Sequence, residues 1–284
     1  MIYLIFSVLS SSLLYVIFKL FERYNINNVQ AITVNYFSAF ALGFYYNEVS
    51  ISVSEVIGAP WILGAVFLGL LFILVFYIMA ITSQKNGLSV TSVASKMSVV
   101  IPVSFGLIVY NESIGLLKIT GILLALVAVY LSSVKSRKGL STKNLLFPIL
   151  LFFGSGTIDT TLKFLETNYV QPEMIPIFSS AIFSFAAIFG LLFLLFKKNS
   201  DWKLKSIIAG LLLGIPNYYS IFFLLKALSS EGLESSTVFT VNHVSILALS
   251  TLIGLVAFKE KMYFKNWIGI ALAIISIFLI IQIA

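Results

Sequence analysis

Ten apolar segments, each about 20 residues long, determine what this chain can fold into. A helix needs about 20 apolar residues to cross the hydrocarbon core of a bilayer. Only 10% of the 284 residues are charged and the mean hydropathy is +1.05, which leaves too little polar surface for a soluble domain. The sequence predicts an all-α membrane protein with ten transmembrane helices, at residues 2–21, 29–46, 60–82, 89–110, 114–133, 145–165, 173–196, 205–227, 235–257 and 265–283.

The lysines and arginines are spread unequally over the loops between these segments. Fourteen follow odd-numbered segments and three follow even-numbered ones. Because positive charge stays on the cytoplasmic side, this bias predicts that both termini lie outside. The same loops account for the net charge of +7, so no nucleic-acid partner is needed to explain it.

Several classes of chemistry are excluded by what the sequence lacks. It has no cysteine, which excludes disulfides and thiolate catalysis. The apolar segments carry one well-embedded carboxylate and one histidine, without metal-ligand spacing, so we expect no catalytic residue, metal or other cofactor. No Walker motif is present, so this chain cannot hydrolyse ATP. We expect that it is not an enzyme, and an intramembrane transferase is the least favoured alternative.

The two halves of the chain resemble each other. A small-residue triplet followed by a lysine and a glutamate recurs at an offset of 144, and a later glutamate–glycine pair recurs at an offset of 148. A five-helix unit duplicated in tandem must insert its second copy upside down. We therefore predict two inverted five-helix repeats, at residues 1–134 and 145–284, joined by a basic linker at 135–144. The matching sets are Ser10–Ser12, Lys19 and Glu22 with Gly154–Gly156, Lys163 and Glu166, and Glu112 and Gly121 with Glu260 and Gly269.

The run Ala94, Pro102, Glu112 and Gly121 resembles the signature of the EamA family of the drug/metabolite transporter superfamily. The resemblance implies ten spans in two repeats, and a transporter of polar metabolites in the inner, cytoplasmic membrane of a bacterium. It also implies cytoplasmic termini, opposite to the orientation that the charge count predicts. It indicates substrate poorly, because similar proteins move amino acids, sugars and nucleotide sugars.

Lys96 is the first candidate site residue. A charge inside a membrane span is costly and usually has a function. Ser92 and Ser95 lie near it on a partly polar helix face, and Pro102 cannot donate a hydrogen bond to the carbonyl of Ser98, which we expect to be left free. We predict that Lys96 binds a substrate carboxylate or phosphate. The alternatives are a lysine that extends to the inner membrane interface, or one that locks its helix to a neighbouring helix.

Asp159 and His243 are expected at similar depth in the sixth and ninth segments. A histidine titrates near neutral pH and suits proton exchange. We hypothesise that both residues face one cavity and carry a coupling proton. The alternatives are a fixed pair between helices, or two residues that never meet.

Uncharged polar residues supply the remaining candidates. Asn217 and Tyr218 follow Pro216 in the eighth segment, and Asn242 precedes His243. Asn217 and Tyr218 could bind substrate, or equally hold helices together, since polar side chains pair across membrane helices. Asn242 could also bind substrate, but for it and the other weaker candidates, Asn35, Thr157 and Thr160, packing is the favoured role.

Together these features predict a secondary-active transporter for a small polar metabolite, most plausibly an amino acid or related carboxylate, working by alternating access. Its expected partners are the substrate, the lipid bilayer and a coupling proton, in a monomer or homodimer. The main alternative is a flippase for a lipid-linked or amphiphilic substrate.

Overall fold

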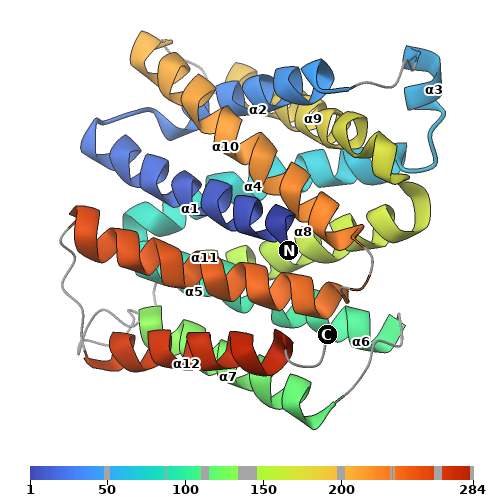
Figure 1. The fold of residues 1–284 in the computed structure, drawn as a ribbon. Coiled ribbons are helices and arrows are strands. Elements are labelled where there is room, and N and C mark those ends of the chain that lie inside the picture. The colour runs from blue at the N-terminus through green and yellow to red at the C-terminus, as the bar shows by residue number, and fades with distance from the viewer. Residues whose placement is uncertain are drawn as a thin grey trace. The chain divides into compact units, whose positions relative to one another are not determined.

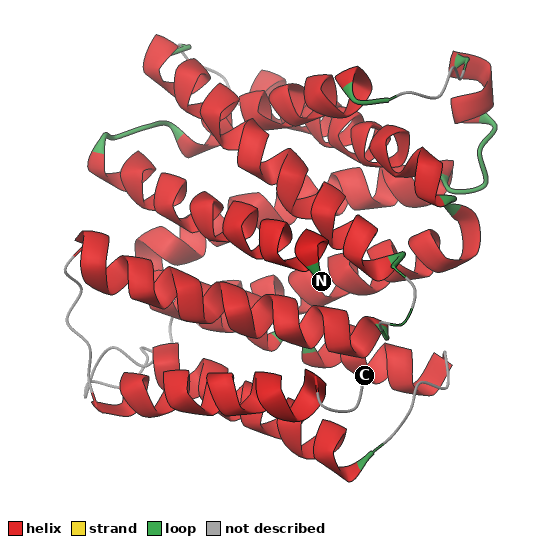
Figure 2. Cartoon of the chain, in the orientation of Figure 1, coloured by secondary structure: helices red, strands yellow, loops and turns green. Residues whose placement is uncertain are grey.

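A computed structural model gives the fold and describes residues 1–47, 52–86, 88–109, 115–133, 146–196, 202–230, 232, 234–258 and 264–281. The regular elements in these ranges are all helices, and none of the described residues forms a strand (Figure 2). The predicted all-α class is confirmed. The predicted linker at 135–144 and the two motif glutamates, Glu112 and Glu260, lie outside the described residues.

The helices follow the predicted apolar segments closely, with two differences. The short helix α3 was not predicted, and the fourth segment forms two helices, α5 and α6, instead of one. The helices are α1 (Ile2–Arg23), α2 (Asn28–Tyr45), α3 (Val53–Ile57), α4 (Ile62–Asn86), α5 (Leu88–Met97), α6 (Val100–Val109), α7 (Leu116–Ser133), α8 (Leu146–Tyr169), the 3₁₀ turn η2 (Pro172–Met174), α9 (Ile175–Phe196), α10 (Leu204–Leu228), α11 (Ser235–Phe258) and α12 (Phe264–Ile281).

Five helical stretches within the described ranges are long and apolar enough to cross a membrane. They establish a multi-pass membrane protein, while the full count of ten spans stays a prediction. The five are Ile2–Arg23, Ile62–Thr82, Pro172–Phe196, Leu204–Leu228 and Ser235–Phe258.

The chain divides into two compact units, and each takes helices from both predicted repeats. Unit 1 comprises residues 1–77 and 161–229, and unit 2 comprises residues 78–160 and 230–284. The boundaries fall inside α4 and α8, so each of these helices contributes one part to each unit.

Unit 1 is built around α2, which packs on α9 and α10, while α1 packs on the other side of α10 (Figure 1). Glycine allows the closest approach in this unit. A Cβ atom at Gly214 of α10 would lie only 2.6 Å from the backbone oxygen of Asn35 in α2, so a larger residue there would push the two helices apart. Asn27 also joins the ends of these helices, because its side-chain oxygen caps α2 and its backbone N–H donates to Ser206 Oγ in α10 at 3.1 Å.

Unit 2 is held together by α7 against α12, and by α11 against α5, α6, α7 and α12 (Figure 1). Ser276 of α12 donates to the Gly121 carbonyl of α7 at 2.7 Å, and Ala128 and Val244 form a small apolar cluster with Leu272. These contacts fix α11, which carries two of the candidate site residues.

The fourth segment is broken at Ser98 and Val99, between α5 and α6. Pro102 is the cause, since it has no amide hydrogen and its ring clashes with the preceding turn. The sequence-based expectation that the Ser98 carbonyl stays free is wrong, because the Ile101 amide donates to it at 2.9 Å. The turn before the proline is tighter than an α-helical turn, because the Val99 amide donates to the carbonyl of Lys96, only three residues earlier, at 3.2 Å.

Candidate functional site

Asp159 and His243 form a buried pair inside unit 2. The Nε2 atom of His243 in α11 lies 3.2 Å from Oδ2 of Asp159 in α8, and the side chains are only 5% and 13% exposed. Two residues that are 84 positions apart in the sequence therefore meet, as one of the sequence-based alternatives required. The proton-carrying role of the pair remains a prediction.

Lys96 completes the charged part of this site. It lies in the last turn of α5, where a cation interacts favourably with the helix dipole, and it is only 9% exposed. Its charge is close enough to the His243 imidazole to interact with it. The Lys96 backbone also lies near the ring, although Nδ1 of His243 makes no hydrogen bond of normal geometry.

Serine hydroxyls line the same helix as Lys96. Ser95 is buried, and its Oγ lies 3.4 Å from Oγ of Ser155 in α8. Sequence reasoning did not single out Ser155, although it belongs to the repeated Gly154–Gly156 triplet that could have marked it. The side chain of Ser92, the other predicted neighbour, lies outside the described residues.

Asn242 adds an unsatisfied polar atom to the helix that carries His243. Its side chain is 2% exposed, and its Oδ1 atom has no hydrogen-bond partner among the described residues. Buried polar atoms without partners are rare, and each one calls for an explanation such as an absent ligand or water. The Asn242 oxygen is therefore open for a small polar molecule.

The structure places Asn217 and Tyr218 in unit 1. Asn217 Nδ2 donates to Asn35 Oδ1 at 3.0 Å, so its amide holds α10 to α2. Tyr218 is fully buried, with its ring 5.5 Å from that of Phe222, and its hydroxyl has no partner within the described part of the chain. Asn217 makes the contact expected of the packing alternative, while the Tyr218 hydroxyl stays available for binding.

The two weaker candidates beside Asp159 bond to their own helix. Thr157 Oγ1 donates to the Phe153 carbonyl at 2.8 Å, and Thr160 Oγ1 donates to the Gly156 carbonyl at 2.7 Å. Such bonds satisfy a hydroxyl inside one membrane helix without any partner helix or ligand.

The second half of the sequence matches the model of a known protein family. Residues 143–282 match the EamA-like transporter family. The match spans just under half of the chain and supports the resemblance to the EamA family that the sequence indicates. EamA proteins are membrane transporters of the drug/metabolite type rather than enzymes, and the expected multi-pass transporter class is confirmed.

Similarity to other proteins extends over nearly the whole chain. An uncharacterized protein of Haemophilus influenzae is 29% identical over 285 residues, which covers 97% of this chain and 96% of the relative. A protein of known crystal structure superposes with a TM-score of 0.74 at 14% identity, covering 98% of this chain and 99% of the other. At that identity the structural likeness concerns the fold alone.

Proposed function

We propose that this EamA-family chain is a secondary-active transporter of a small polar metabolite, resident in the cytoplasmic membrane of a bacterium. The observation that carries the proposal is the buried cluster of Lys96, Asp159 and His243, on three different helices of unit 2. Ionisable groups inside membrane helices mark substrate and proton pathways, because their burial is otherwise too costly to retain.

The cluster favours a substrate that carries a carboxylate. Lys96 supplies a cation at the break between α5 and α6, and Asn242 offers an amide on the neighbouring helix α11. A carboxylate binds an ammonium by a charge-assisted hydrogen bond, and an amino group of the same molecule can donate to the Asn242 oxygen. An amino acid is the substrate class that satisfies both groups.

Contacts between corresponding segments support the inverted repeat that alternating access requires. The second segment, α2, packs on the seventh, α9, and the fifth, α7, packs on the tenth, α12. The ninth, α11, likewise packs on both halves of the fourth, α5 and α6. A two-fold axis brings a segment against its own copy in this way.

A broken helix beside the cluster fits the same mechanism. Many secondary transporters bind substrate and coupling ions at discontinuous helices near the middle of the membrane. In this chain the break at Ser98 and Val99 follows Lys96 directly. We propose that protonation of the Asp159–His243 pair, whose imidazole interacts with the Lys96 charge, accompanies binding at Lys96.

The test is uptake into proteoliposomes containing the full chain. A panel of labelled amino acids, sugars and organic acids is assayed with and without a pH gradient, using wild type, Lys96→Ala and the control Lys226→Ala. The control removes a lysine whose amine donates to the Pro172 carbonyl in unit 1.

We expect uptake of at least one carboxylate-bearing compound, reduced at least tenfold by Lys96→Ala and unchanged by Lys226→Ala. Uptake that survives Lys96→Ala would assign that lysine a structural role. A protein that transports nothing in the panel would contradict the metabolite proposal.

A further inference from the structure

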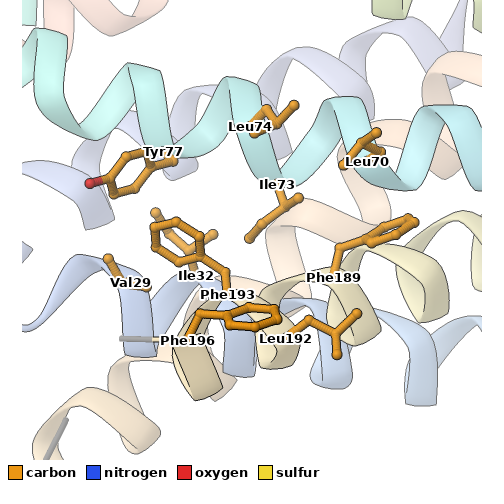
Figure 3. Close-up of a pocket in the computed structure, with 10 residues that line it drawn as sticks. All are labelled: Val29, Ile32, Leu70, Ile73, Leu74, Tyr77, Phe189, Leu192, Phe193 and Phe196. Atoms are coloured by element: carbon orange, nitrogen blue, oxygen red, sulfur yellow. The ribbon is translucent and has the colours of Figure 1, made fainter. Parts of the chain in front are cut away.

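A wholly apolar groove opens on the outer surface of unit 1. It has a volume of about 240 Å³ and is lined by side chains from α2, α4 and α9 (Figure 3). Figure 3 shows Ile73 and Leu74 of α4 on one side, and Phe193 and Phe196 of α9 on the other. Leu74, Phe193 and Phe196 are 46%, 41% and 86% exposed, so the groove faces outward rather than into the unit. In a membrane-spanning bundle, such a surface contacts the hydrocarbon chains of the lipids.

The groove runs along the helix axes. Its lining residues extend from Leu70 to Tyr77 on α4 and from Phe189 to Phe196 on α9, which is about 10 Å at 1.5 Å per residue. This shape accepts an extended, flexible chain. The rings of Tyr77 and Phe193, with centroids 5.2 Å apart, narrow the groove at one end. This end also contains Val29, in the first turn of α2.

Basic residues gather at that end of unit 1. Gln30, the neighbour of Val29, accepts a hydrogen bond from the Lys203 amide at 3.3 Å, which places the start of α10 beside the groove. Lys205 Nζ donates to the Tyr24 carbonyl at 3.0 Å, next to Arg23 at the end of α1. Arg23, Lys203 and Lys205 are all exposed, and we call them the basic rim.

The charge at this end is not cancelled by the acidic residue nearby. Glu22 is the acidic neighbour within the described part of this helix end, and it interacts with Lys19. Among the described residues at this end, the three rim cations therefore outnumber the single carboxylate of Glu22. Trp202 is 49% exposed beside the rim, as is common for aromatic residues at the level of lipid headgroups.

We propose that unit 1 binds one anionic phospholipid of the surrounding bilayer, with an acyl chain in the groove and the phosphate at the basic rim. Acyl chains match a lining that offers no polar partner, and anionic headgroups are attracted by basic residues near the membrane surface. The phospholipid is a bound structural partner and not the transported substrate. The site lies in unit 1, separate from the Lys96 cluster of unit 2.

Native mass spectrometry of the purified full chain tests this site. The probes are palmitoyl-oleoyl phosphatidylglycerol and palmitoyl-oleoyl phosphatidylcholine, which share acyl chains, and dihexanoyl phosphatidylglycerol, which has the anionic headgroup on short chains. We expect the long-chain phosphatidylglycerol to bind at least fivefold more tightly than the phosphatidylcholine, since each cation that contacts the headgroup contributes about 1 kcal/mol, or about fivefold.

Two variants separate the headgroup from the acyl chain. Lys203→Gln combined with Lys205→Gln leaves only Arg23 at the rim, so it should reduce the preference for phosphatidylglycerol at least fivefold while leaving phosphatidylcholine binding unchanged. Leu74→Trp should fill the groove and weaken both long-chain lipids. Its control is Leu63→Trp, which adds the same side chain to α4 at a position that is 80% exposed and outside the groove.

Three results would overturn the proposal. The first is equal affinity for the two long-chain lipids. The second is equal binding by the Leu74→Trp and Leu63→Trp variants when both are folded, as judged by thermal unfolding. The third is binding of dihexanoyl phosphatidylglycerol as tight as that of the long-chain form, which would mean that the headgroup binds without the groove.

Discussion

Single residues in unit 2 carry most of the functional argument. Asp159, His243 and Lys96 place two basic groups and one carboxylate in a buried space, where the His243 imidazole interacts with both neighbours. Such a group of residues changes its net charge by one when a single proton enters. That is the property a proton-coupled transporter needs at its binding site.

Neutral variants of the pair should separate coupling from binding. Asp159→Asn and His243→Gln keep the approximate shape of each side chain but remove the group that exchanges a proton. We expect uptake driven by a pH gradient to fall at least tenfold in both, while exchange of substrate for substrate is retained. The measurement is proteoliposome uptake with the gradient imposed or collapsed, and full gradient-driven uptake in both variants would rule out coupling at this pair.

Asn242 should show a conflict between stability and function. Its Oδ1 atom is buried without a partner in the described structure, so Asn242→Leu removes an unsatisfied polar group. Replacing such a group by an apolar one of similar size is neutral or stabilising, by about 1 kcal/mol. We expect the unfolding temperature in detergent to stay the same or rise while uptake falls. A clear decrease in unfolding temperature would show that Asn242 has a packing role.

Among the helices, α3 depends most visibly on local hydrogen bonds. Ser52 caps it in a reciprocal arrangement, because Ser52 Oγ accepts from the Glu55 amide at 3.3 Å and Glu55 Oε2 accepts from the Ser52 amide at 2.7 Å. The bonds from the Ser52 amide and then its hydroxyl hold the pKa of the exposed Glu55 carboxyl below its ordinary value.

This capping predicts a pH dependence for α3. Because the pKa of Glu55 is lowered by folding, its contribution is complete above the pKa of the unfolded segment and is lost as the pH falls through the lowered pKa. Hydrogen exchange of the amides in residues 53–57, corrected for the intrinsic pH effect, should show less protection at acidic pH. Glu55→Gln should remove that dependence, and an unchanged dependence in this variant would contradict the assignment.

The sequence predicted where helices lie better than where they break. The apolar segments end within a few residues of the helix ends because a run of hydrocarbon side chains has to match the membrane thickness. Pro102 predicted an irregular helix, because it has no backbone N–H to donate. The position of the break depends on which other amide donates to the Ser98 carbonyl, and in the structure this is the amide of Ile101.

The candidate site shows the same limit. The free energy needed to bury an ionisable side chain in a membrane depends on residue type alone. This cost singled out Lys96, Asp159 and His243 in the sequence. The partner of each side chain depends on the rotation and packing of the helices, which cannot be predicted from a single sequence. Asn217 illustrates this, since its bond to Asn35 across α10 and α2 became visible only in the structure.

At the scale of the whole molecule, the orientation in the membrane is the open prediction. The charge bias predicts outside termini, whereas the EamA resemblance implies cytoplasmic ones. The absence of cysteine allows a direct test, because a single introduced thiol has no background. If the charge bias holds, Ser54→Cys in α3 should react with a membrane-impermeant maleimide in intact cells, and Lys203→Cys only after permeabilisation. The reverse pattern would establish cytoplasmic termini.

The placement of Lys96 also has a consequence for how the protein is made. α5 carries four hydroxyl side chains and a lysine in ten residues, so it enters a membrane poorly by itself. The residue that interacts with its lysine, His243, lies 147 positions later in the chain (243 minus 96), which the ribosome reaches on the order of ten seconds afterwards at 5–20 residues per second. During biosynthesis α5 must therefore wait near the insertion machinery or the membrane surface until α11 arrives to cover it.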